Sequence, residues 1–139
     1  MEDDGADMTY DRIRLYFGVF EGDPDRISEI MGVTPFRSWR KGDAGPSGST
    51  RTHDRWELRG PGCERELFSA QLEELLGILE DKKSAVQAVA SEYDAGVMCT
   101  ATFSEEYNPE LHMSSSAIAR LAALGLSCDF DLYMLGGTD

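Results

Sequence analysis

The sequence predicts an α+β fold, in which helices cover one face of a mainly antiparallel sheet in a ferredoxin-like arrangement. Two observations carry this prediction. Segments with alternating apolar residues, typical of strands, are interspersed with segments whose apolar residues recur every three or four positions, typical of helices. A strand–helix–strand pattern also occurs near each end of the chain, at residues 13–40 and 97–134. We therefore expect two pseudo-duplicated strand–helix–strand units.

The first half of the chain is predicted to contain a strand, a short helix and a long hairpin. Alternation over residues 11–20 indicates a strand with one buried face. Asp23-Pro24 is typical of a helix start, and Gly32 of its end. The hairpin arms are expected near Trp39 and at residues 55–59, joined by a glycine- and serine-rich segment that we expect to be exposed and mobile.

The second half is predicted to be helical, then strand, helix and strand. Residues 69–93 have a helical apolar pattern with Ser69 as the cap, and residues 94–96 are expected to end it. The polar run at residues 80–84 leaves open whether this segment is one long helix or two. A strand at residues 97–103, a helix capped by residues 114–116 and a last strand at residues 127–135 follow.

Length and composition predict one domain, at residues 10–139, preceded by a disordered acidic tail at residues 1–9. Hydrophobic residues at 41% and charged residues at 28% are ordinary for globular proteins. The three cysteines are odd in number and far apart, so neither a disulfide framework nor a zinc motif is indicated. We expect a cytoplasmic protein with no signal peptide, no membrane span, no cofactor and no metal.

The net charge of -13, from 26 acids and 13 bases, opposes binding to nucleic acid and to anionic lipid. The charge is unevenly distributed along the chain. Residues 37–59 hold six bases and three acids, or +3, whereas residues 1–36 carry -6 and residues 60–139 carry -10. We therefore expect neither a nucleic acid nor a membrane as partner, and we call residues 37–59 the basic island.

Opposite charges are also predicted on two strands. Arg12 and Arg14 lie on the outward side of the first strand, and Asp129 and Asp131 on the outward side of the last. If the two strands are neighbours in the sheet, these charges should pair across them.

Several short motifs together resemble a known family. They are Met31-Gly32-Val33-Thr34-Pro35, Ser38-Trp39-Arg40-Lys41-Gly42, Trp56-Glu57-Leu58 and the segments Leu121-Ala122-Ala123-Leu124-Gly125 and Asp129-Phe130-Asp131-Leu132-Tyr133. In this order they resemble the bacterial family of domain of unknown function 4279, over about residues 10–133. The resemblance implies a stand-alone bacterial cytoplasmic domain and carries no catalytic residue or ligand with it.

The basic island predicts an anion-binding site on the hairpin, because guanidinium groups form bidentate hydrogen bonds with phosphate or carboxylate. The candidate ligand-binding residues are Arg37, Trp39, Arg40, Lys41, Arg55 and Trp56, with Arg51 and Arg59 in the same basic set. An alternative interpretation is structural, with both tryptophans in the core and the arginines paired with nearby acids.

Other chemistry is less favoured by the sequence. The segment at residues 42–50 lacks the lysine of a nucleotide-binding P-loop, and Pro46 removes a backbone donor. His53 and His112 are far from each other and from the cysteines, so no metal-ligand spacing is present. The serines at 114–116 near His112 are better explained as a helix cap than as a catalytic pair. The sequence thus favours a non-enzymatic protein and names no catalytic residue.

We expect a non-enzymatic acidic interaction module, for which an immunity-type binder of a basic protein is one form, since complementary charge speeds association and selects partners. The alternative is a sensor or enzyme that binds a small anionic ligand at the basic hairpin around Trp39 and Arg40. A pocket shared by Trp39, Arg40 and Trp56 would favour this alternative.

Overall fold

A computed structural model describes residues 13–59, 67–106 and 108–135. The predicted acidic tail, Arg12 and Cys63 lie outside the described residues. The elements in chain order are β1 (Ile13–Phe20), α2 (Pro24–Met31), β2 (Arg37–Trp39), the short 3-10 helix η1 (Pro46–Gly48), β3 (Arg55–Leu58), α3 (Phe68–Glu80), α4 (Lys83–Glu92), β4 (Asp94–Phe103), α5 (Ser115–Leu124) and β5 (Ser127–Met134).

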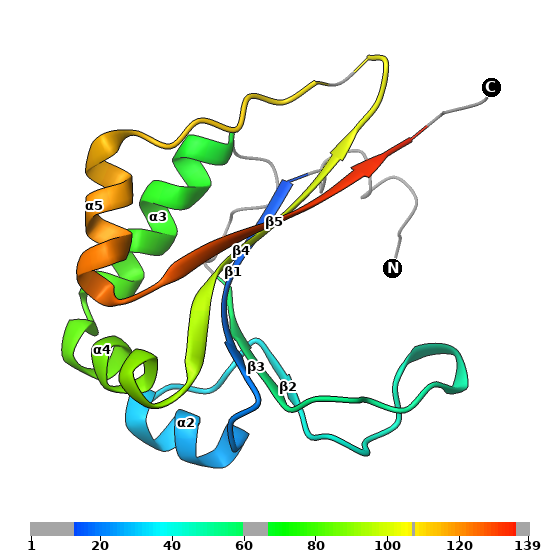
Figure 1. Cartoon of the computed structure of the whole chain (residues 1–139), viewed down its shortest axis with the longest axis vertical. Helices are drawn as coiled ribbons and strands as arrows, with labels where there is room; N and C mark the ends of the chain where they lie inside the picture. Colours follow the sequence, from blue (N-terminus) through cyan, green and yellow to red (C-terminus); the bar gives the residue numbers. More distant parts are fainter. Residues whose placement is uncertain (1–12, 60–66, 107, 136–139) are drawn as a thin grey trace.

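The strands form one sheet in the order β2-β3-β1-β4-β5. Neighbouring strands are antiparallel except β4 and β5, which are parallel. The four described α-helices lie on one side of this sheet, which we call the covered face, and leave the other side as an open face (Figure 1). The predicted α+β fold with a mainly antiparallel sheet is confirmed.

The two strand–helix–strand units share strand direction but differ in spacing. In β4–α5–β5 the parallel strands are neighbours. In β1–α2–β2 both strands are antiparallel to β3, so they run parallel to each other with β3 inserted between them. The two units therefore differ in one respect: the parallel strands are adjacent in the second unit, and a third strand separates them in the first.

The expected charge pairing between the first and last strands is wrong, because β4 lies between β1 and β5. Arg14 is opposite Thr100, and Thr100 is in turn opposite Asp131, so the two charges are separated by a whole strand. Alternation of apolar and polar residues predicts which side chains of a strand share a face of the sheet, but it does not predict which strands are neighbours.

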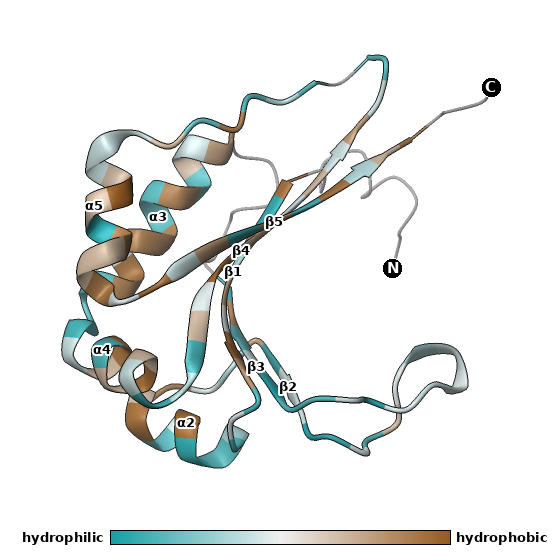
Figure 2. Ribbon diagram, viewed as in Figure 1, coloured by the Kyte–Doolittle hydropathy of each residue, from teal (hydrophilic) through white to brown (hydrophobic). Residues whose placement is uncertain are grey.

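The core lies between the covered face and the helices, where apolar residues of both gather (Figure 2). Leu15, Phe17 and Val19 of β1 are buried there. Trp56 is fully buried at the same face, edge-on to Phe17 with ring centroids 6.1 Å apart. Its indole N–H donates to the Ser28 hydroxyl on α2 at 2.9 Å, so the one polar atom of this side chain is satisfied.

Local signals placed most helix ends correctly. The Asp23 carboxylate accepts from the Asp25 N–H, Pro24 is the first helical residue, and Gly32 ends α2 with a positive φ of 69°. The Ser114 hydroxyl likewise caps α5, and Gly125 ends it at φ 79°.

The segment at residues 69–93 is two helices, α3 and α4, broken at Asp81 and Lys82. Lys82 has φ -120° and ψ 36°, which is outside the helical region. The predicted Ser69 cap is wrong, since α3 begins at Phe68 after Leu67, which makes no side-chain cap. The predicted helix end before residues 94–96 is confirmed, since α4 ends at Glu92 with Tyr93 as its C-cap. The next strand begins earlier than predicted, at Asp94 rather than at residue 97, because residues 94–96 already pair with β1.

The excursion between β2 and β3 is exposed as predicted, but it has regular contacts. Residues 40–54 form a narrow extension in which Ala44 bridges Thr50 and the Gly42 N–H donates to the Arg51 carbonyl at 2.9 Å. Figure 1 shows this extension projecting from the sheet on the side away from the helices. It therefore carries Arg51 toward the open face.

Candidate functional site

The structure brings only part of the predicted anion site together. Arg37, Trp39 and Arg55 share the open face, because Arg37 and Trp39 are two residues apart and Trp39 pairs with Arg55. Arg40 and Trp56 are on the other side of the sheet. No shared pocket of Trp39, Arg40 and Trp56 can form, since Trp56 lies in the core.

Arg40 fastens the hairpin to α2. Its guanidinium lies 2.8 Å from carboxylate oxygens of both Asp23 and Asp25, at the start of that helix. These hydrogen bonds, above all that with Asp23, raise the pKa of Arg40. Lys41 contributes its backbone N–H to the Asp54 carboxylate at 2.7 Å, and its side chain is exposed. Arg40 is thus a structural residue.

A buried carboxylate organises the open face at this end of the sheet. Glu57, only 2% exposed, accepts from Arg37 through Nε at 3.1 Å and Nη2 at 3.0 Å. Its second oxygen accepts from Arg55 Nη1 at 2.7 Å. Gly18 of β1 stands opposite Glu57, and a Cβ built there would lie 3.1 Å from the Met98 sulfur. Hydrogen bonds to ionised groups are stronger than neutral ones, so Glu57 holds both guanidiniums in place.

Three arginines surround the indole of Trp39. The guanidinium carbon of Arg51 lies 3.7 Å from the ring centroid, that of Arg37 5.4 Å and that of Arg55 5.6 Å. These distances fall in the range of cation–π attraction. We call Arg37, Arg51, Arg55, Trp39 and Glu57 the arginine cluster.

More aromatic residues extend the cluster along the open face. Arg55 also lies over Phe20 at 4.6 Å, and Arg59 lies over Tyr16 at 5.5 Å and over Phe36 at 5.3 Å. Glu57 was missed as a site residue in the sequence, although its position as an acid inside the basic island was a signal. The contribution of Tyr16 and Phe20 had no local signal, because β1 lies far away in the sequence.

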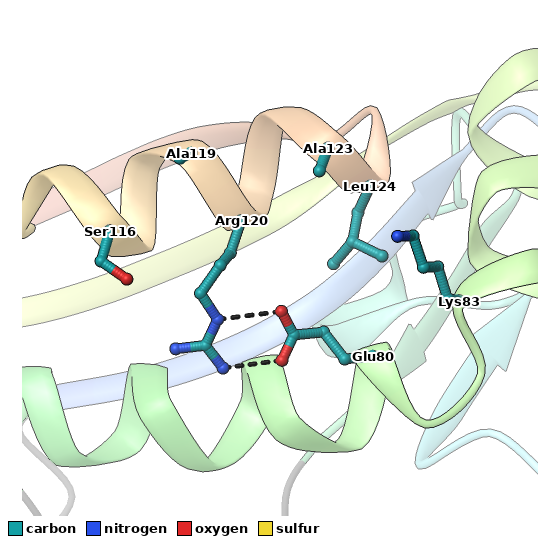
Figure 3. Close-up of a pocket in the computed structure, with 7 residues that line it drawn as sticks. All are labelled: Glu80, Lys83, Ser116, Ala119, Arg120, Ala123 and Leu124. Atoms are coloured by element: carbon teal, nitrogen blue, oxygen red, sulfur yellow. Dashed lines mark hydrogen bonds and ion pairs between the residues drawn. The ribbon is translucent and has the colours of Figure 1, made fainter.

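A groove lies between the helices, and two of its charged side chains pair with each other. It has a volume of about 340 Å³ and is lined by residues of α3, α4 and α5, including Lys83 and Leu124. Arg120 crosses it and binds the Glu80 carboxylate with two hydrogen bonds of 2.9 and 2.7 Å (Figure 3). Arg120 Nη1 also binds Glu73 at 2.7 Å. The charges in this groove are therefore used to fasten α5 to α3.

The edge strand β5 is the second unusual surface. On its covered-face side, exposure rises along the strand from Phe130 at 41% to Leu132 at 54% and Met134 at 78%. Phe130 still touches Phe68 of α3, with centroids 5.8 Å apart, and the strand then runs past the helices (Figure 1). On the open-face side, Asp129 and Asp131 alternate with these apolar residues.

These two aspartates have no basic partner in the described part of the chain: no lysine or arginine lies within ion-pair distance of either. The Asp131 carboxylate accepts a hydrogen bond of 2.7 Å from the Tyr133 hydroxyl, which raises the pKa of Tyr133. The edge therefore presents two solvated carboxylates on one face and an apolar row on the other.

Among the described residues, Cys99 and Cys128 are not placed as reactive thiols. Burial raises the pKa of Cys99 to about 12 and also raises that of the half-buried Cys128, so both thiols stay protonated at neutral pH. Ser114 is engaged as a helix cap, beside His112. Within residues 13–59, 67–106 and 108–135, no three histidine, cysteine or acidic side chains are grouped to hold a metal ion.

Comparison with known proteins shows which family this chain belongs to. The family described as Domain of unknown function (DUF4279) matches residues 11–135. The chain belongs to the DUF4279 family. No curated protein and no solved structure matches this DUF4279 chain. None of the helices in its described residues is both long and apolar enough to cross a lipid bilayer.

Proposed function

We propose that this DUF4279 protein is a non-enzymatic interaction module, and that its β5 edge takes up an extended segment of a basic protein. The observation that carries the proposal is the pattern of β5. Acidic and apolar residues alternate along an edge whose outer side pairs with no other strand among the described residues. Such an edge offers free backbone N–H and C=O groups to an added strand.

The side chains of β5 define the chemistry of that segment. A strand laid beside β5 places its residues 4.5–5.5 Å, roughly, from those of β5, alternately on the two faces. Lysine or arginine would then face Asp129 and Asp131, and apolar side chains would extend the row of Phe130 and Leu132. A basic segment with alternating apolar residues satisfies both faces at once.

The charge of the whole chain favours the same partner. At -13, the protein attracts a basic molecule over a long range and repels a second copy of itself. An immunity-type role, in which the chain occludes a basic protein such as a nuclease, is the form of this function that the charge favours. A small-anion site on the hairpin is a second candidate, favoured by the stacked Arg51.

The test uses a fluorescent eight-residue peptide of alternating lysine and valine, matching the eight residues of β5. A peptide of the same composition with its lysines and valines in two blocks has equal charge and the wrong pattern. Fluorescence anisotropy should show the alternating peptide binding more tightly. Equal affinity for both peptides would show attraction by charge alone and would overturn the proposal.

Matched variants locate the binding. Asp129→Asn/Asp131→Asn should weaken the alternating peptide by about 2- to 30-fold, since each charged cross-strand pair contributes about 0.2–1 kcal/mol. Glu29→Gln/Asp81→Asn removes the same charge from two exposed positions on the helix side and should leave affinity nearly unchanged. Equal effects of the two double variants would reject β5 as the binding edge, as would a wild-type dimer joined through β5.

A further inference from the structure

We propose that the arginine cluster on the open face is a binding site for a small dianionic oxyanion, of which a phosphate group is the best match. This site is separate from the β5 edge and takes a ligand of opposite charge. Three features of the cluster point to this ligand: its positive charge, the fixed position of Arg51, and the guanidinium nitrogens of Arg37 and Arg55 that Glu57 does not use.

The cluster has more positive charge than its own acid compensates. Three guanidiniums, of Arg37, Arg51 and Arg55, surround one carboxylate, that of Glu57, which leaves +3 - 1 = +2. Among the residues that the structure describes, no carboxylate is within ion-pair distance of Arg51. The chain has 26 acids and 13 bases. The positive charge of the arginine cluster is therefore left uncompensated in a chain that is rich in acids.

Arg51 is held in place without an ionic partner. Its guanidinium stacks on Trp39, and a Cβ built on Gly45 would lie 3.4 Å from its Cδ and Nε. The side chain is therefore enclosed between the indole and the backbone at Gly45, and Nε is buried without a hydrogen-bond acceptor. The backbone of Arg51 is fixed as well, because its N–H donates to the Asp43 carbonyl at 2.8 Å. Little side-chain freedom is left to be lost when a ligand binds.

Arg37 and Arg55 are also held in place, in their case by hydrogen bonds to Glu57. The carboxylate uses Nε and Nη2 of Arg37 and Nη1 of Arg55. The remaining nitrogens, Nη1 of Arg37 and Nε and Nη2 of Arg55, make no hydrogen bond to the described residues. Arg55 Nη1 also contacts the Met98 sulfur at 3.5 Å. Planar donors in a fixed fork match two oxygens of one phosphate or carboxylate.

A dianion balances the surplus of +2, and phosphate carries close to that charge at neutral pH. The indole edge of Trp39 beside the cluster would suit a phosphate attached to a planar group. Free phosphate and a phosphate monoester share this chemistry, so both serve as probes: inorganic phosphate and adenosine monophosphate.

The experiment is calorimetric titration of each probe at about 0.15 M salt, where exposed charges are screened over about 8 Å, with Trp39 fluorescence as a second readout. Binding of either probe to the wild type supports the site, and tighter binding of adenosine monophosphate identifies a monoester as the ligand class. Arg51→Met keeps a side chain that can stack on Trp39 and should weaken binding by at least about tenfold, as expected for loss of a charge-assisted hydrogen bond. Absence of heat and of a fluorescence change with both probes would overturn the proposal.

Arg40→Met is the matched control, because it removes the same charge from the same hairpin at a side chain that points to α2. It should leave affinity within about twofold of the wild type, since a distant exposed charge is largely screened. A loss as large as that of Arg51→Met would indicate attraction by net charge only and would overturn the site. Asp129→Asn/Asp131→Asn should keep the affinity for the anion, so this test and that of the β5 edge fail independently.

Discussion

At the scale of single residues, Glu57 is the side chain on which the open face depends most. It lies at 2% exposure between two guanidiniums. A glutamine there would lose the negative charge and would turn an NH2 donor toward one of the two guanidiniums in place of an acceptor oxygen. Hydrogen bonds to an ionised group contribute about 1.5–3 kcal/mol, and the partial exposure of Arg37 and Arg55 lowers that figure.

We therefore expect Glu57→Gln to reduce the free energy of unfolding by about 1–2 kcal/mol, measured by urea denaturation. Glu29→Gln removes the same charge from an exposed position on α2 and should stay within about 0.5 kcal/mol of the wild type. Equal stabilities of the two variants would mean that the Glu57 ion pairs contribute nothing.

Cys99 makes stability depend on alkaline pH. Burial raises its pKa to about 12 from an ordinary value of 9.0, so between these values the unfolded chain has lost a proton that the folded chain keeps. Stability from this group is fully present below pH 9 and falls as pH rises toward 12, by at most about 1.4 kcal/mol per pH unit.

Cys99→Ala should therefore flatten the decline in unfolding free energy between pH 8 and pH 10, as measured by urea titrations at both values. Cys128 and Tyr133 have raised pKa values as well and leave a residual slope in the variant. Parallel declines in wild type and variant would contradict the prediction.

The sequence identified residues whose role is set by near neighbours and missed those set by distant ones. Asp23, Gly32 and Ser114 act within their own helix ends, so their chemistry is visible in a few consecutive letters. Trp39 and Trp56 differ in role only because they point to opposite faces, and alternation does not say which face the helices cover. Glu57 accepts from Arg37 of another strand, 20 residues away in the sequence, and no local pattern reveals that pair.

At the scale of elements, α5 is fastened to α3 by Arg120. The hydrogen bonds from Arg120 lower the pKa of Glu80, so the stability from this pair is present above the ordinary glutamate pKa of 4.5 and is lost as pH falls through the lowered value. Ala117, Leu121 and Leu124 bury the other side of α5 and keep it in place without the ion pair.

Arg120→Met should lower the thermal midpoint by a few degrees at pH 7, and this difference from the wild type should shrink as pH falls through the lowered pKa of Glu80. Lys83→Met is the control, because it removes a charge from the same groove without removing a hydrogen bond to Glu80. A deficit of Arg120→Met that stays the same as pH falls below 4.5 and the wild type loses its ion pair would assign the effect to lost packing of the arginine stem.

The sequence predicted which segments are helices or strands and where most of them end. It did not predict the break between α3 and α4 or the order of the strands in the sheet. The polar run at residues 80–84 allowed one helix or two, because the apolar stripe continues on both sides of it. Tertiary packing decides this, with α4 placed against both α2 and β4 while α3 packs on β1. The insertion of β3 between β1 and β2 is likewise a long-range pairing that alternation cannot predict.

At the scale of the whole molecule, the two unusual surfaces lie at opposite ends of the sheet. The arginine cluster belongs to β2 and β3 and carries +2, and β5 at the far edge carries Asp129 and Asp131. The sheet therefore has a charge gradient from one edge to the other within a chain of -13. The uneven charge was visible in the sequence, but the distance between its two ends required the strand order.

This charge also protects an edge that would otherwise self-associate. An exposed strand with an apolar row is prone to pair with another copy, and charged residues on such edges oppose it. We expect the wild type to sediment as a monomer at about 0.15 M salt, because two chains of -13 repel and the aspartates of β5 meet like charges. Asp129→Asn/Asp131→Asn should shift the protein toward dimers, and about 1 M salt should do the same to the wild type. Glu29→Gln/Asp81→Asn changes the net charge equally and should remain monomeric, so a monomeric β5 variant would show that the two aspartates do not guard this edge.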